Sequence, residues 1–174
     1  MKYATPKVIW LVGMSGQEKS ILAEMLQDIC RNRSIPAMVV KDEQMGLCSG
    51  DACQALGLNE SMRLGHLAKT LANQGYPVIV SAPPHTGETL AKNRAELPGY
   101  FEVYLASEYD SPEVVPVAPD LRVFANNLLA SIGGFRDLAE DIFEEVFGRG
   151  QLMPEALGRA HLPAGGLQSA LQAI

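Results

Sequence analysis

The residues best suited to chemistry form a stretch of eight near the N-terminus, GMSGQEKS at positions 13–20. The nearest known pattern is G-x-x-x-x-G-K-[ST], in which loop amides surround phosphates, the lysine reaches the outer ones and the hydroxyl holds Mg²⁺. The stretch therefore predicts a site for ATP, with Ser20 as the Mg²⁺ ligand. The candidate ATP-binding residues are Gly13, Ser15, Gly16, Lys19 and Ser20. A plainer interpretation stays open, in which Lys19 and Ser20 simply begin a helix after a Gly-rich turn.

The second glycine of this pattern is replaced by Glu18. A glycine at that place commonly has a positive φ, which costs another residue roughly 1–2 kcal/mol. A carboxylate about 4 Å from a phosphate charge adds a repulsion of roughly 4 kcal/mol at an effective dielectric constant of about 20. Since about 1.4 kcal/mol is a factor of ten in affinity, Glu18 is expected to weaken ATP binding by orders of magnitude. A carboxylate that points outward, or that pairs with Lys19, would repel less.

Short apolar runs alternate along the chain with segments whose apolar residues recur at helical spacing. This alternation predicts βαβ units with right-handed crossovers, and hence a three-layer α/β/α fold with a mostly parallel sheet, like that of P-loop hydrolases and kinases. Ligands of such sheets bind at the carboxyl ends of the strands, so the residues directly after each strand are candidates for the site. The expected strands are Val8 to Val12, Ala37 to Val40, Pro77 to Val80, Tyr100 to Leu105 and Asp120 to Phe124, and helices are expected around Ser20 to Ile29, Leu64 to Ala72, Leu90 to Leu97 and Leu138 to Phe147.

Length and charge narrow the classes of function. The 174 residues suit one domain with an ordinary core. The formal net charge of −6 provides no field that would draw the chain to nucleic acid or to an acidic membrane. The apolar run after Lys7 is too short for a signal peptide or a membrane span, which predicts a cytoplasmic location. The three cysteines form no Cys-x-x-Cys pair and the histidines are scattered, so a zinc site is not expected, and Cys30 is expected in the core.

Four segments resemble the adenylylsulfate kinase (APS kinase) family, whose loop typically reads IWxTGLSGxGKSTLA. They are VIWLVGMSGQEKSILA from Val8, HLAKTLANQGYPVIV from His66, YFEVYL from Tyr100 and the stretch Val117 to Val123. The resemblance covers most of residues 7–147, and the segments follow one another in the family's order. It implies the P-loop kinase fold, ATP and Mg²⁺ as cofactors, transfer of a phosphoryl group to adenylyl sulfate and a place in sulfate assimilation.

The resemblance also implies roles for residues beyond the loop. Lys19 would be a catalytic residue that holds the phosphates. Glu43 lines up with the second aspartate of the family's Asp-Gly-Asp and would be the catalytic base. Arg63 is retained from an arginine-rich run, and His85 lies in the turn that replaces Ser-Pro-Tyr-Arg, so both would bind substrate. The plainer interpretations are a solvated acid for Glu43 and a surface loop histidine for His85. Trp10 also follows the family pattern and is expected to pack against the first helix.

The chain departs from the family where the chemistry takes place. Glu18 stands in the loop, most anion-binding arginines are absent, and a short, acidic, proline-rich stretch, Ser107 to Pro119, replaces the family's long basic lid. The expected organisation is a kinase-like domain over residues 1–148 and a tail over residues 149–174. The tail carries two weak apolar stripes and would dock on its own domain, on a second copy or on a further domain.

Two functions follow from these observations. In the first, the chain is catalytically impaired and serves a binding, regulatory or assembly role, with another protein or a second copy of itself as the partner. In the second, it is an active ATP-dependent kinase that phosphorylates adenylyl sulfate or another small hydroxyl-bearing molecule. The lid and the second glycine of the loop separate the two, and the sequence lacks both.

Overall fold

The structure is a computed structural model, which describes residues 7–13, 18–42, 60–83, 85–108, 110, 112, 115–124 and 132–148. Within these residues the chain forms a five-stranded, wholly parallel sheet in the order β2-β3-β1-β4-β5. The strands are β1 (Val8–Gly13), β2 (Met38–Lys41), β3 (Val78–Ser81), β4 (Tyr100–Ala106) and β5 (Leu121–Phe124). All six residues of β1 are buried, as expected of an apolar central strand that is covered on both faces.

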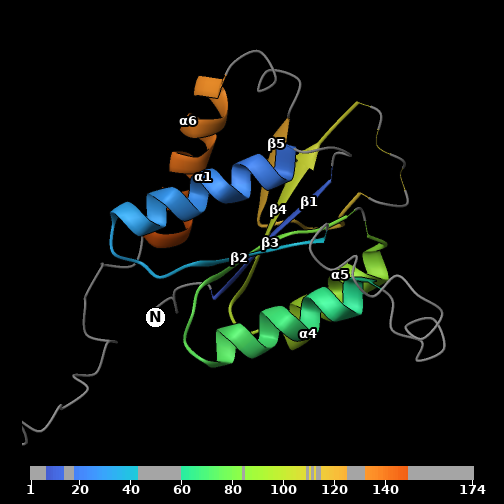
Figure 1. Cartoon of the computed structure of the whole chain (residues 1–174). Helices are drawn as coiled ribbons and strands as arrows, with labels where there is room; N and C mark the ends of the chain where they lie inside the picture. The colour runs from blue at the N-terminus through green and yellow to red at the C-terminus, as the bar shows by residue number, and fades with distance from the viewer. Residues whose placement is uncertain are drawn as a thin grey trace, which may run out of the picture.

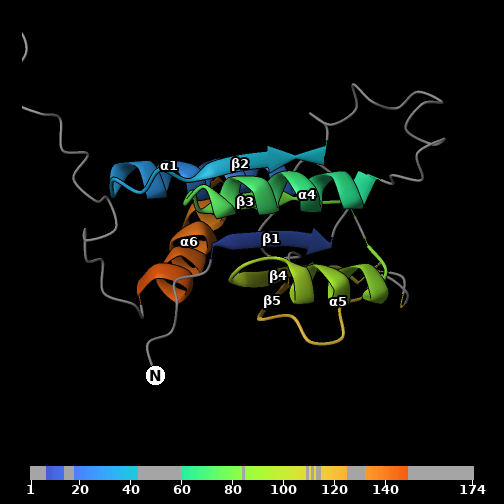
Figure 2. The same cartoon turned by 90° about the horizontal axis from the view of Figure 1, so that it is seen from below.

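Helices cover both faces of this sheet, which confirms the predicted three-layer fold (Figures 1 and 2). One face packs against α1 (Glu18–Asn32) and α6 (Ile132–Phe143), which continues as the π-helical turn η4 (Glu144–Gly148). The other face packs against α4 (Glu60–Asn73) and α5 (Gly87–Glu96). None of the helices in the described ranges is long and apolar enough to cross a membrane.

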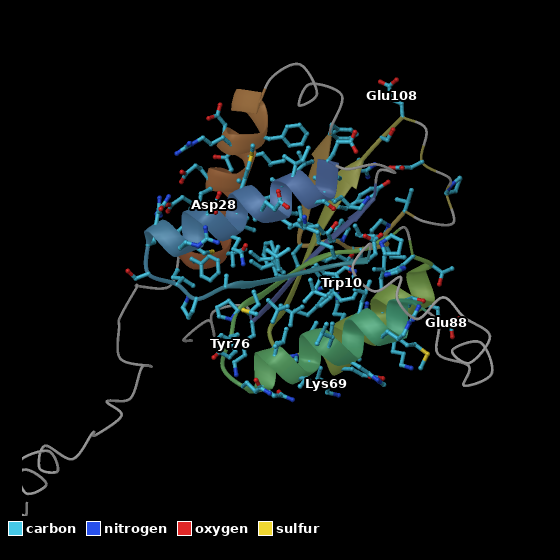
Figure 3. The ribbon with its side chains drawn as sticks, in the orientation of Figure 1. Trp10, Asp28, Lys69, Tyr76, Glu88 and Glu108 are labelled. Carbon is cyan, nitrogen blue, oxygen red and sulfur yellow. The ribbon has the colours of Figure 1, made fainter. Side chains whose placement is uncertain are left out.

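Trp10 lies on the opposite side of the sheet from the one expected. It is fully buried in the core beneath α4 and α5, together with Val8 and Val12, whereas α1 covers the face that bears Ile9 and Leu11 (Trp10 is labelled in Figure 3). The alternation along a strand groups residues 8, 10 and 12 on one face but does not say which helix covers that face. The prediction that Trp10 packs against the first helix was therefore wrong.

Helix α5 begins earlier than the apolar pattern predicted. It starts at Gly87, after Thr86, whose hydroxyl accepts a hydrogen bond from the backbone N–H of Thr89 at 3.5 Å. Leu97, expected as part of the helix, has an extended backbone and forms its C-cap. The capping residue sets the start, because a side-chain oxygen satisfies a backbone N–H that has no partner inside the helix.

The connection between β4 and β5, residues 107–120, crosses from one end of the sheet to the other without an α-helix among its described residues. Near its start, the Asp110 carboxylate accepts hydrogen bonds from the Tyr104 hydroxyl at 2.6 Å and from the Ser107 N–H at 2.7 Å. Val115, near its middle, packs against the core beneath α5. We call this segment the β4–β5 connection; it contains Ser107 to Pro119, the stretch that was predicted to replace the family's lid.

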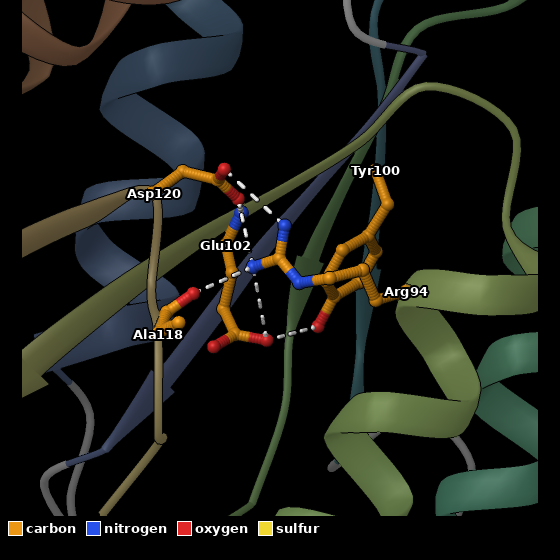
Figure 4. A network of polar contacts seen from close by, with 5 residues as sticks. All are labelled: Arg94, Tyr100, Glu102, Ala118 and Asp120. Carbon is orange, nitrogen blue, oxygen red and sulfur yellow. Dashed lines mark hydrogen bonds and ion pairs between the residues drawn. The ribbon is translucent and has the colours of Figure 1, made fainter.

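A polar network holds the other end of the β4–β5 connection (Figure 4). Arg94 of α5 pairs with Asp120 at 2.9 Å and donates to the carbonyl oxygen of Ala118 at 3.1 Å. Asp120 accepts from the backbone N–H of Glu102 at 2.8 Å, and the Glu102 carboxylate accepts from the Tyr100 hydroxyl at 2.8 Å. The network therefore joins α5, β4 and the start of β5 at the amino ends of the strands.

Glu102 is the most buried member of this network, at 2% exposed. Burial raises the pKa of its carboxyl above the usual value, although the hydrogen bond from Tyr100 and the charge of Arg94 act in the opposite direction. A carboxyl whose pKa is higher in the folded than in the unfolded state stabilises the fold at low pH. That contribution is lost as the pH rises through the folded-state value.

Replacing the charged carboxyl with a neutral amide should therefore stabilise the protein at neutral pH. We expect Glu102→Gln to have a larger free energy of unfolding than the wild type at pH 7, and we expect the difference to shrink towards about pH 4. Urea unfolding across this pH range measures it. Glu108→Gln, a change at an exposed carboxyl, is the matched control and should show no such trend. A Glu102→Gln difference that stayed constant with pH would contradict the assignment.

Candidate functional site

The candidate site lies at the carboxyl end of the central strand, where β1 ends at Gly13 and α1 begins at Glu18. The candidate ligands Ser15 and Gly16 lie outside the described residues, as does Glu43, the predicted catalytic base. Their roles stay predictions. Gly13, Lys19 and Ser20 are described, and the strand before and the helix after the loop follow the order that the phosphate-binding pattern requires.

Gly13 cannot be replaced by a larger residue without movement of the sheet. Its φ is +98°, a region that residues with a side chain rarely adopt. A Cβ atom at this position would lie 2.3 Å from the carbonyl oxygen of Leu105 and 2.8 Å from the ring of Tyr104. The end of β1 is thus pressed against β4, and position 13 leaves no room for a side chain.

Lys19 and Ser20 sit in the first turn of α1 and are almost fully buried, at 4% and 6% exposed. The Ser20 hydroxyl lies 3.3 Å from the hydroxyl of Ser81, the last residue of β3. The structure therefore brings the predicted lysine and hydroxyl together at the edge of the sheet. Ser81 was not predicted, although a hydroxyl that ends an apolar strand could have indicated it.

Glu18 is the first residue of α1 and adopts a helical backbone. Ser34 is the one residue other than glycine with a positive φ in the described part of the chain, so the expected backbone strain at Glu18 was wrong. The carboxylate atom Oε2 of Glu18 is buried without a hydrogen-bond partner. The carboxylate lies at the positive end of the helix dipole, which favours a negative charge there.

The end of β2 places charges beside α1. Lys41, the last residue of this strand, forms an ion pair and a hydrogen bond with Glu24 of α1. Asp42 follows and is partly buried. Lys41 therefore has a structural partner on α1.

The two predicted substrate-binding residues lie on the α4 and α5 side of the sheet. Arg63 is in the first turn of α4 and is partly buried. His85 lies between β3 and α5, is 6% exposed, and its ring centroid is 5.9 Å from that of Trp10. The plainer interpretation of His85 as a surface histidine was therefore wrong. Substrate binding by either residue stays a prediction.

Metal-binding side chains do not gather elsewhere in the described part of the chain. No group of three or more His, Cys, Asp or Glu side chains in it is arranged to hold a metal ion. Cys30 is a free thiol in the core, as predicted, and burial raises its pKa to about 11. A buried thiol with a raised pKa is a poor nucleophile.

Comparison with known proteins decides the family. A family model described as adenylylsulphate kinase matches residues 5–116, more than half of the chain. The chain belongs to the adenylylsulphate kinase family. This result confirms the resemblance that the loop and the strand motifs indicated.

Two curated relatives show how far the similarity extends. The adenylyl-sulfate kinase of Deinococcus deserti is 30% identical over 129 residues, which is 68% of this chain and 65% of that protein. The cytidine diphosphoramidate kinase of Campylobacter jejuni is 26% identical over 112 residues, 63% of this chain and 65% of that protein. The matched region thus spans less than two thirds of either relative.

Solved structures agree with the fold. A variant of the APS kinase of Mycobacterium tuberculosis superposes with a TM-score of 0.61 at 25% identity, covering 80% of this chain and 96% of that one. The hexameric APS kinase of Thiobacillus denitrificans, at 19% identity, has a TM-score of 0.59 and covers 87% of this chain and 31% of that one. The second comparison supports the fold alone.

The tight contact at the end of β1 predicts the effect of adding one methyl group. Gly13→Ala should lower the free energy of unfolding by roughly 2–5 kcal/mol, because the backbone strain at positive φ adds to overpacking against β4. Gly75→Ala is the matched control, since Gly75 has a φ of +96° but no atom within 4 Å of the added Cβ. Gly75→Ala should lower the free energy of unfolding by only roughly 1–2 kcal/mol. If urea unfolding gave equal losses of unfolding free energy for Gly13→Ala and Gly75→Ala, the contact with Leu105 would contribute nothing to the effect at position 13.

Proposed function

We propose that this member of the adenylylsulphate kinase family has lost effective phosphoryl transfer and serves a binding, regulatory or assembly role. The observation that carries the proposal is the Glu18 carboxylate, which stands at the start of α1 directly before Lys19. In the phosphate-binding pattern this place belongs to a glycine, next to the amides and the lysine that hold phosphates.

Only the charge of Glu18 would oppose the binding of a phosphate, because the helical backbone of this residue is unstrained. A phosphate charge about 4 Å from the carboxylate would be repelled by roughly 4 kcal/mol, which corresponds to about a thousandfold in affinity. A carboxylate in the first turn also interacts favourably with the helix dipole in the absence of any ligand. The residue thus supplies the negative charge that the bound phosphate would otherwise supply.

The β4–β5 connection supports the same proposal. Lids that close over a substrate move, and their closure completes the catalytic site and excludes water. Here Asp110 attaches the start of the connection to β4, and Asp120 and Ala118 attach its end to Arg94 of α5. A segment held at both ends by charged hydrogen bonds is poorly suited to act as a lid.

One observation favours the alternative, an active kinase. Lys19 and Ser20 are buried together beside Ser81, in the arrangement that would suit ATP and Mg²⁺. In that case Lys19 would bind the outer phosphates, Ser20 would hold the metal, and Glu43 would position the acceptor hydroxyl, with Arg63 and His85 at the substrate. The acceptor would be adenylyl sulfate or another small hydroxyl-bearing molecule.

The proposed role requires a partner. We expect this partner to be another protein or a second copy of the chain, and the APS kinase of Thiobacillus denitrificans is hexameric. The division of the chain into a kinase-like domain over residues 1–148 and a docking tail over residues 149–174 belongs to this proposal. The tail's two apolar stripes would provide the contact.

Removing the charge of Glu18 should restore ATP binding. We expect little or no heat when the wild type is titrated with ATP and Mg²⁺, and binding that is tighter by up to about a thousandfold for Glu18→Gly. Glu18→Gln should recover as much as Glu18→Gly, because the helical backbone makes the charge the dominant obstacle. Isothermal titration calorimetry measures all three affinities, with Asp28→Asn on the exposed side of α1 as the control for a lost carboxylate.

The outcomes separate the two functions. Micromolar binding of ATP to the wild type, together with transfer of phosphate to adenylyl sulfate, would refute the proposal and support the active kinase. Absence of binding in the wild type and recovery in both Glu18 variants would support the proposal. Recovery in Glu18→Gly but not in Glu18→Gln would show that the side chain's bulk, and not its charge, blocks the loop.

A further inference from the structure

A groove of about 260 Å³ lies between α4 and α5, on the face of the sheet opposite α1. Its lining includes Gly65 and Lys69 from α4 and Glu88, Lys92 and Asn93 from α5 (Lys69 and Glu88 are labelled in Figure 3). Typical ligand sites have volumes of about 300–1,000 Å³, so this groove suits a molecule smaller than a nucleotide. The groove shares no lining residue with the candidate phosphate site.

Asn93 gives the groove a hydrogen-bond donor without an acceptor. The residue is 8% exposed, and its side-chain nitrogen Nδ2 is buried with no hydrogen-bond partner. The other atom of its amide, Oδ1, lies 3.4 Å from the place where a Cβ of Gly65 would be, so the amide sits between the two helices. A buried donor without a partner is costly, and an oxygen of a bound molecule would satisfy it.

The two walls of the groove carry opposite charges. The α4 wall contributes Lys69 and no acid, whereas the α5 wall contributes Glu88 and Glu96. Lys92 also belongs to the α5 wall, but it lies one helical turn from each of these acids and its ammonium is 4.0 Å from Glu96. Lys69 and Glu88 form no ion pair within the described ranges, so the walls do not neutralise each other across the groove.

We propose that the α4–α5 groove binds a zwitterion of amino-acid size. Its carboxylate accepts hydrogen bonds from Asn93 Nδ2 and from the Lys69 ammonium, because charge-assisted hydrogen bonds to a carboxylate are the strong ones. Its ammonium group faces Glu88. At about 260 Å³ the groove is smaller than typical ligand sites, which favours a small molecule over a nucleotide. A simple anion would use Asn93 and Lys69 but would make no favourable contact with Glu88.

The test is a titration of the ¹⁵N-labelled protein with each common amino acid in turn. The NMR signals of the Asn93 side-chain amide report binding. Acetate and methylammonium, at matched ionic strength, serve as probes that carry only one of the two charges. We expect at least one amino acid to shift the Asn93 signals and those of both helices in a saturable way, with an affinity about tenfold or more above either single-charge probe. No saturable shift with any amino acid, or an equal response to acetate, would overturn the proposal.

Variants separate the two ends of the ligand. Lys69→Gln should weaken the binding of amino acids and of acetate alike. Glu88→Gln should weaken the binding of amino acids and of methylammonium but leave the affinity for acetate unchanged. Lys7→Gln removes the same charge as Lys69→Gln away from the groove and should change nothing. Asn93→Leu should abolish binding; because this buried residue also packs between the helices, the Lys69 and Glu88 variants decide the outcome if it fails to fold. Unchanged affinities in both of those variants would refute the proposal.

Discussion

The close approach of β1 and β4 at Gly13 is the constraint on which the rest of the candidate site depends. The carbonyl oxygen of Leu105 fills the space where a side chain would project from Gly13, and Tyr104 closes the same space from beside it. On the other edge of β1, Leu11 pairs with Ser81, so three strand ends meet where α1 begins. The contact therefore fixes the start of α1 and, through Tyr104 and Asp110, the start of the β4–β5 connection.

Much of the fold could be predicted because strands and helices have different hydrophobic periods. The five strands appear in the predicted order, whereas every helix begins before its predicted start, most of all α6, which begins at Ile132 and not at Leu138. In α5 the sparse apolar pattern around Leu90 did not reveal the cap at Thr86. The face on which Trp10 lies could not be predicted. A period of two groups the residues of a strand, but the hand of each crossover and the packing of whole helices decide which group meets which helix.

The candidate site was predictable in its local part only. The order of strand, turn and helix placed Lys19 and Ser20 at the edge of the sheet, because such a motif is contiguous in sequence. The hydroxyl of Ser81 comes from a strand 61 residues further along, and only the pairing of β1 with β3 brings it close. The helical backbone at Glu18 was also missed, since the expectation of strain assumed the geometry of a loop that holds phosphate.

The β4–β5 connection has a consequence for how this fold tolerates change. The Arg94–Asp120 pair attaches the start of β5 to α5, and Asp110 independently accepts a hydrogen bond from Ser107, directly after the end of β4. Between these two attachment points the described residues belong to no strand and no α-helix, and Val115 packs against the core beneath α5. Insertions there would meet only the slowly rising entropy of a longer loop. The same scaffold can thus gain or lose a long loop at this position during evolution while its core packing remains intact.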